Sequence, residues 1–136
     1  MTAVSTRPLS TSADALLRFA LRADATLTGF AGLLVAAFAN PLATLTGLSP
    51  TTEYFLGAAF VVYGLVVFWL AALPSLRSVG IAICIANVLS TIVTLLIVLA
   101  DAAPLTEAGL AATLATGVYT AFFACLQYVG VRRLRG

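Results

Sequence analysis

Residues 79–100 read VGIAICIANVLSTIVTLLIVLA, an apolar stretch without a single charged residue. At about 1.5 Å of rise per residue, a helix of this length crosses a hydrocarbon core of about 30 Å. The stretch therefore predicts a transmembrane helix. Asn87, Thr91 and Thr94 recur in it at spacings of four and three, so they share one face. Because an amide in hydrocarbon needs a hydrogen-bond partner, we expect other helices to assemble around this one.

The composition of the whole chain agrees with a membrane protein and excludes several kinds of chemistry. Of its 136 residues, 62% are hydrophobic and only 9% are charged, which is too apolar for a soluble domain of this size. Histidine is absent, so imidazole ligands for haem or zinc and a histidine general base are excluded. The net charge of +2 is too small to indicate nucleic acid as a partner. We expect no cofactor, no metal and no catalytic site, and the lipid bilayer as the main partner.

Hydropathy and helix-boundary signals divide the chain into four spans. The first eleven residues are polar, so residues 1–11 are predicted to be a flexible N-terminal segment, and residues 12–136 a single transmembrane domain. An amphipathic lead-in with an N-cap at Ser12 precedes the first span. The spans are predicted over residues 24–39, 51–73, 79–100 and 106–131. With the short connections between them, they predict an all-α, antiparallel four-helix transmembrane bundle.

The arginines fix the expected orientation of this bundle. With four spans, every arginine falls on one side of the membrane: Arg7, Arg18, Arg22, Arg77, Arg132, Arg133 and Arg135. The opposite side carries only Glu53, Asp101 and Glu107. By the positive-inside rule, both termini are expected to be cytoplasmic.

A signal peptide is the competing interpretation of the N-terminal region. Arg18 and Arg22 precede an apolar core that ends in Ala37-Phe38-Ala39, which imitates an A-x-A cleavage site. We favour a retained helix, because small residues recur along it and would let a neighbouring helix approach closely. This stripe consists of Gly29, Gly32, Ala36 and Ala39.

The polar residues inside the spans are the candidate functional residues. They are Asn87, Thr91, Thr94, Thr116, Thr120, Gln127, Tyr63 and Tyr119. In the interpretation that we favour, they hold the helices together through hydrogen bonds worth about 0.6 kcal/mol each. In the alternative, they line a small cavity or path for a neutral or amphiphilic molecule, since no ionisable group is expected at mid-depth.

Asp24 is the acid nearest to the membrane interior. It stands at the start of the first predicted span, level with Arg77 and Arg132, so the three are predicted to form a charge cluster at the cytoplasmic boundary. In the alternative, Asp24 points inward toward Gln127 and acts as a coupling or gating residue.

Three segments resemble a family: LRADA at residues 21–25, ANVLS at 86–90 and ACLQYVGVRR at 124–133. They resemble small uncharacterised four-helix integral membrane proteins of actinobacteria. The resemblance implies a bacterial plasma-membrane location and supplies no activity. We expect a non-enzymatic accessory or assembly subunit of a membrane complex, with a membrane protein or further copies of itself as partner. The alternative is a small oligomeric transporter or channel.

Overall fold

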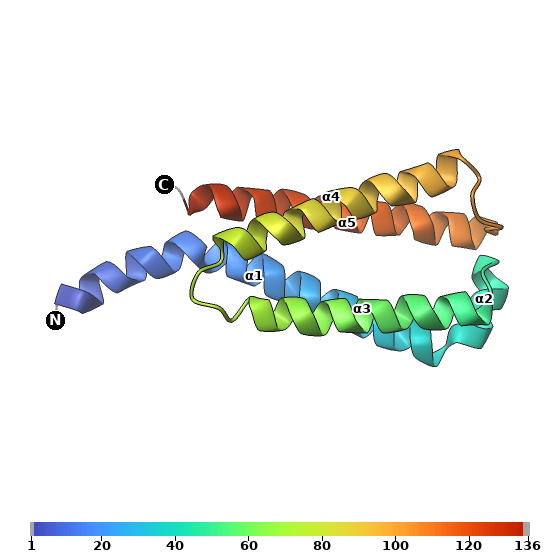
Figure 1. Cartoon of the computed structure of the whole chain (residues 1–136), viewed down its shortest axis with the longest axis horizontal. Coiled ribbons are helices and arrows are strands. Elements are labelled where there is room, and N and C mark those ends of the chain that lie inside the picture. Colours follow the sequence, from blue (N-terminus) through green and yellow to red (C-terminus); the bar gives the residue numbers. More distant parts are fainter. Residues whose placement is uncertain (1, 135–136) are drawn as a thin grey trace.

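The computed structural model describes residues 2–134, with side chains from residue 14 onward, and this part of the chain contains helices and no strand. The helices are α1 (Thr2–Ala37), α2 (Ala39–Thr46), α3 (Pro50–Leu70), α4 (Arg77–Leu99) and α5 (Glu107–Arg133) (Figure 1). Four segments are long and apolar enough to cross a membrane: Asp14–Ala37 of α1, and the whole of α3, α4 and α5. The all-helical class and the four apolar spans are thus confirmed.

The first span differs from the prediction at its start. The apolar segment includes Asp14–Ala37 and not only the residues from 24 onward, and α1 is one continuous helix in which Ser12 lies inside the helix and not at an N-cap. The side chains of residues 1–13 and 135–136 lie outside the described part of the structure. The flexibility expected for residues 1–11 stays a prediction.

Side-chain caps start α3 and α5 where the sequence indicates. Ser49 accepts a hydrogen bond of 3.1 Å from the backbone N–H of Thr52, and Pro50 occupies the first turn of α3. Thr106 accepts one of 3.0 Å from the backbone N–H of Gly109 in the first turn of α5. The predicted loop between the first two spans instead contains α2, which ends at Gly47 with a left-handed φ of 90°.

Glycine contacts bring α1 and α3 together. A Cβ added to Gly32 would lie 2.5 Å from the carbonyl oxygen of Gly57, and a Cβ added to Gly64 would lie 2.6 Å from that of Ala25. Side chains cannot occupy such space, so the two backbones touch directly. Residue numbers increase along α1 in the direction in which they decrease along α3, since Ala25 meets Gly64 and Gly32 meets Gly57. The predicted role of the small-residue stripe in helix packing is confirmed for Gly32 and, through Gly57, for Ala36.

Hydroxyl groups connect α4 to α5. Thr91 Oγ1 lies 2.6 Å from Thr120 Oγ1, and a Cβ on Gly117 would lie 2.7 Å from Thr94 Oγ1. The short connection after α3 predicts that α3 and α4 pack side by side, and this prediction is wrong. Helix α3 packs on α1 and helix α4 packs on α5, so α3 and α4 barely touch although only a short connection joins them. Figure 1 shows the two pairs, α1 with α3 and α4 with α5.

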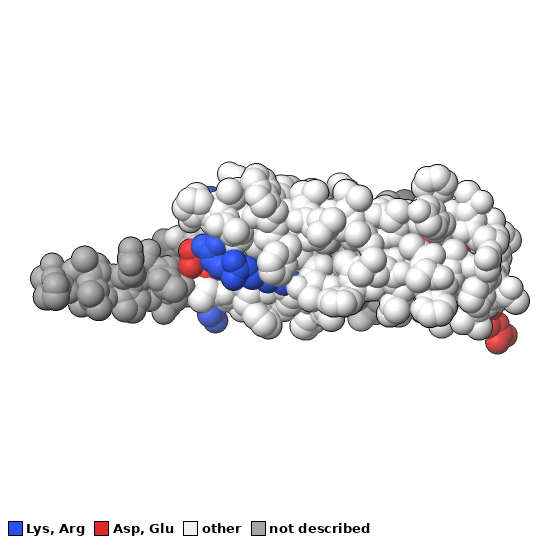
Figure 2. Space-filling model, turned by 90° about the horizontal axis from the view of Figure 1, so that it is seen from below, with Lys and Arg blue, Asp and Glu red and all other residues white. Residues whose placement is uncertain are grey.

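An apolar plug closes the bundle at one end, which we call the arginine end because Arg18, Arg22, Arg77 and Arg132 lie there. The plug consists of the buried residues Leu17, Leu21, Ala25, Val67, Ala71, Leu76 and Val131. Beside it, Arg18 donates to the carbonyl oxygens of Ala71 (2.5 Å) and Leu73 (3.1 Å), and so caps the end of α3. On the face drawn in Figure 2, charged side chains gather toward the two ends and a broad uncharged band separates them.

Candidate functional site

Asp24 is fully buried in the middle of its span, with 0% of its surface exposed. Its hydrogen-bond partner Asn87 stands halfway along α4, a helix long enough to cross a bilayer, which places the carboxylate near mid-depth. An ionisable group therefore lies at mid-depth, contrary to the prediction. Such groups are costly in a bilayer and usually serve a function.

Three side chains donate to one carboxylate oxygen of Asp24. Oδ2 accepts hydrogen bonds from the hydroxyl of Tyr63 at 2.8 Å, from Nδ2 of Asn87 at 3.0 Å and from Nε2 of Gln127 at 3.0 Å. The two amides are also bonded to each other, since Asn87 Nδ2 donates to Gln127 Oε1 at 2.9 Å. Gln127 is itself 0% exposed. One oxygen thus ties α1 to α3, α4 and α5.

Two hydroxyl groups approach the other oxygen. Tyr119 donates to Asp24 Oδ1 at 2.9 Å, and the hydroxyl of Thr28, one turn along α1, lies 3.1 Å from the same atom. The Thr28 and Tyr119 hydroxyls are also 2.9 Å apart. We call Asp24, Thr28, Tyr63, Asn87, Tyr119 and Gln127 the Asp24 cluster.

The cluster stabilises a buried charge with neutral groups alone. Burying a carboxylate without partners is strongly unfavourable, whereas hydrogen bonds to an ionised group are among the strongest in proteins. Within the part of the chain whose side chains are described, no fully buried polar side-chain atom lacks a partner. The arrangement is therefore complete, and the negative charge has no cation beside it.

The predicted boundary charge cluster of Asp24, Arg77 and Arg132 does not form, and the alternative, with Asp24 pointing inward toward Gln127, is observed instead. Arg77 and Arg132 line a shallow hollow at the arginine end together with Tyr128, but Asp24 is not part of it. Among residues 14–134, the one ion pair joins Arg18 to Asp14 at 3.1 Å. Asp24 points inward because it is two residues after Arg22, about 200° around the helix, so the two side chains face opposite ways.

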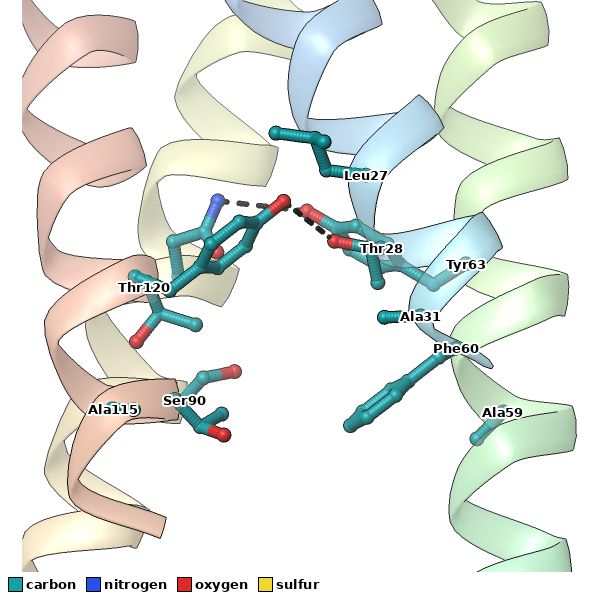
Figure 3. A pocket seen from close by; sticks show the side chains of 12 residues that line it. Leu27, Thr28, Ala31, Ala59, Phe60, Tyr63, Ser90, Ala115 and Thr120 are labelled. Carbon is teal, nitrogen blue, oxygen red and sulfur yellow. Dashed lines mark hydrogen bonds between the residues drawn. The ribbon is translucent and has the colours of Figure 1, made fainter. Parts of the chain in front are cut away.

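A cavity of about 500 Å³ lies between the helices next to the Asp24 cluster. Four members of the cluster form its floor: Thr28, Tyr63, Asn87 and Tyr119. Its walls extend toward α2 and are mostly apolar, with contributions from Leu27, Ala31, Ala59, Phe60, Ser90, Ala115, Thr116 and Thr120. In Figure 3, Thr28 and Tyr63 lie close together at one end, while Phe60 and Ser90 lie across the opening from each other.

The structure divides the predicted polar residues into two groups. Five of them line the cavity: Tyr63, Asn87, Thr116, Tyr119 and Thr120. Gln127 lies behind the floor, and Thr91 and Thr94 lie in the contact between α4 and α5. Thr94 donates to the carbonyl of Thr91, and Thr116 to that of Ala112, at 2.8 and 2.9 Å. The position of Thr91 and Thr94 thus supports a role in helix packing, whereas the five lining residues support the cavity interpretation.

Replacing Thr91 with valine is expected to lower the free energy of unfolding by about 0.6 kcal/mol and by no more than about 1.7 kcal/mol. The substitution keeps the shape and removes the 2.6 Å contact with Thr120. The measurement is unfolding in mixed micelles followed by circular dichroism. Thr26→Val is the matched control, because Thr26 is exposed on α1. An equal loss in both variants would contradict a role of Thr91 in helix packing.

Seven of the twelve residues that line the cavity were not predicted from the sequence. Thr28 follows Asp24 by four residues, a spacing that already places both on one face of α1. The apolar wall residues gave no signal, because Leu27, Ala31 and Phe60 look like any lipid-facing residues. Only the divergence of the two helix pairs turns them toward a common space.

No protein-family model, no curated protein and no solved structure matches the chain. In residues 14–134, no three side chains of the His, Cys, Asp or Glu type lie close enough to share a metal ion. The site combines a buried carboxylate, acceptor oxygens and apolar walls, and pockets that bind small molecules typically have this composition.

Proposed function

We propose that the protein binds a small amphiphilic molecule in the cavity between its spans and acts as a carrier or small transporter for it. The observation that carries this proposal is the cavity of about 500 Å³ with a polar floor and apolar walls. This volume lies within the range of ligand sites in proteins, about 300–1,000 Å³. Residues of all four spans line this space, and four polar side chains converge on its floor.

The lipid face beside the cavity supports entry from the bilayer. An apolar groove runs between α3 and α4, lined by residues that include Ala59, Tyr63 and Ala86. The groove shares Ala59 and Tyr63 with the cavity, so the two lie on either side of one thin wall. Since α3 and α4 barely touch, a small separation of these helices joins groove and cavity.

A carrier fits the geometry better than an open channel. On the other side of the Asp24 cluster from the cavity lies the apolar plug with Leu17, Leu21 and Val67. Passage to the arginine end therefore requires the bundle to rearrange. The expected accessory or assembly role, with a membrane-protein partner or a homo-oligomer, stays a second hypothesis that native mass spectrometry in mild detergent can test.

The location that we propose is the bacterial plasma membrane, crossed by an antiparallel four-helix bundle with both termini in the cytoplasm. Two arguments support it: the segregation of all arginines to one side of the four spans, and the resemblance to actinobacterial membrane proteins. Tyr54 and Trp69 lie exposed near opposite ends of α3, as interfacial anchors do.

Filling the cavity is expected to weaken binding strongly. Ala115 lines the cavity, and tryptophan in its place should weaken the binding of 1-octanol and n-octylammonium by about tenfold or more, because a ring and a ligand cannot share the space. Binding is measured by calorimetry in nanodiscs of zwitterionic lipid, with empty nanodiscs subtracted.

Ala82→Trp is the matched control for this experiment, because Ala82 is exposed on α4 and does not line the cavity. It should bind both compounds as the natural protein does. If neither compound binds saturably to the natural protein, or if Ala115→Trp binds both unchanged, the proposed function is wrong.

A further inference from the structure

The tyrosines at the floor of the cavity have no proton left for a ligand. A phenol carries one proton. Tyr63 donates its proton to Asp24 Oδ2 at 2.8 Å, and Tyr119 donates its proton to Asp24 Oδ1 at 2.9 Å. Both side chains line the cavity, so what they offer to a bound molecule are the lone pairs of their oxygens.

Thr28 is committed in the same way. Its hydroxyl lies 3.1 Å from Asp24 Oδ1 and 2.9 Å from the Tyr119 oxygen, and both are acceptors for its single proton. Whichever of the two it serves, the proton stays inside the cluster. The Thr28 oxygen is then a further acceptor at the edge of the cavity.

Asn87 completes the pattern. Its Nδ2 donates to Asp24 Oδ2 at 3.0 Å and to Gln127 Oε1 at 2.9 Å, which uses both amide protons. Because both partners are acceptors, the orientation of the amide is fixed. Asn87 lines the cavity and its Oδ1 takes part in none of the cluster's hydrogen bonds, so this fourth floor residue also has a free acceptor oxygen to offer.

The negative charge of the Asp24 carboxylate, behind the floor of the cavity, also favours a ligand that donates protons or carries a positive charge. All side chains that contact the Asp24 carboxylate are neutral, so its negative charge polarises the floor oxygens and is not cancelled locally. In the low dielectric of a membrane protein, such a charge attracts a cation across one intervening hydroxyl. The walls at Leu27, Ala31 and Phe60 suit an apolar body.

We propose that the cavity selects a cationic amphiphile whose protonated amine donates to the floor oxygens of Tyr63, Tyr119 and Asn87. This inference rests on the proposed function and names its ligand class. It replaces the neutral solute expected from the sequence, because that expectation assumed that no ionisable group lies at mid-depth.

The test compares three compounds of equal chain length: n-octylammonium, n-octyltrimethylammonium and 1-octanol. Each is titrated into the natural protein in zwitterionic nanodiscs, with empty nanodiscs subtracted. We expect n-octylammonium to bind about tenfold more tightly than 1-octanol, because it adds a charge and further N–H donors. The trimethyl compound keeps the charge but has no N–H, so it should bind more weakly than n-octylammonium.

Two variants locate the preference. Asp24→Asn removes the charge, so n-octylammonium should lose its advantage over 1-octanol. If this variant does not fold, Tyr63→Phe serves instead, because it removes one floor oxygen and leaves the carboxylate its other donors. It should reduce the advantage several-fold.

Two results would overturn the proposed selectivity for cations and leave the proposed binding function standing. If 1-octanol binds as tightly as n-octylammonium and both are blocked by Ala115→Trp, the cavity binds amphiphiles but is not selective for cations. If an ammonium preference exists and persists unchanged in the Asp24→Asn or Tyr63→Phe variant, it does not come from the Asp24 cluster. Failure of both compounds to bind contradicts the proposed function itself.

Discussion

Asp24→Ala is expected to lower the free energy of unfolding by about 3–5 kcal/mol, because several buried donors lose their acceptor and each unsatisfied group costs about 1–3 kcal/mol. The five donor groups around the carboxylate would lose their common acceptor, and they come from all four spans. Gln127 is fully buried and does not line the cavity, so its amide has no water to turn to. The measurement is unfolding in mixed micelles, followed by circular dichroism.

Two further variants make this prediction specific. Asp24→Asn keeps one acceptor oxygen, so it should lose less stability than alanine, about 1–3 kcal/mol. Asp14→Asn removes an acid from the same helix, but Asp14 is partly exposed and pairs only with Arg18, so the loss should be about 1 kcal/mol or less. A boundary role for Asp24 would give the Asp24 and Asp14 variants similar, small losses.

Gly64→Ala is expected to separate α1 from α3 and to cost about 1–3 kcal/mol or more. The added Cβ would lie 2.6 Å from the Ala25 carbonyl oxygen and 2.9 Å from Gly29 Cα, both backbone atoms that cannot move aside without shifting the helix. Thermal unfolding in detergent measures the loss.

Gly29→Ala is the matched control, because Gly29 on α1 faces Gly64 on α3 in the same contact between the two helices. Its Cβ would meet Gly64 Cα at 3.8 Å, an ordinary contact. The variant should be as stable as the natural protein or slightly more so, since alanine is the better helix former. If both glycines tolerate alanine equally, the backbone contact between α1 and α3 is not as close as described.

The existence of the four spans and the starts of α3 and α5 could be predicted from the sequence because they depend on local patterns. Hydropathy locates four helices, and Ser49 with Pro50 shows where α3 begins. The contact of Gly32 with Gly57 was also foreseeable, since small residues at helical spacing have few other uses in a membrane helix.

The inward position of Asp24, toward Gln127, was the alternative to a boundary charge cluster in the sequence analysis, and it is the one that the structure shows. Arg22 and the apolar run after Asp24 suggest a membrane boundary, and this argument favoured the boundary cluster. It did not take into account on which side of the helix each side chain lies. Two residues turn the helix by about 200°, so Asp24 faces away from Arg22 and toward the bundle. The residues that receive it, Asn87 and Gln127, stand on polar faces that the sequence does reveal.

A small polar cavity was one of the two interpretations of the sequence, but its apolar walls and its position could not be predicted, because they depend on how the helix pairs lie relative to each other. The short connection between α3 and α4 favours close packing of these helices. Instead, the glycines draw α3 onto α1, while hydroxyl contacts such as Thr91 with Thr120 draw α4 onto α5. The space between the pairs results from this competition, which no pattern within a single helix records.

The distance between the Asp24 carboxyl carbon and Gln127 Nε2 tests the central claim most directly. Gln127 is the one glutamine in the sequence, so side-chain ¹⁵N-glutamine with carboxyl-¹³C-aspartate gives a single nitrogen site. Solid-state NMR in lipid bilayers should find strong dipolar dephasing at a separation of about 4 Å, as follows from the hydrogen bond of 3.0 Å. A separation above about 6 Å, too long for that bond, would contradict a carboxylate held by neutral donors inside the bundle.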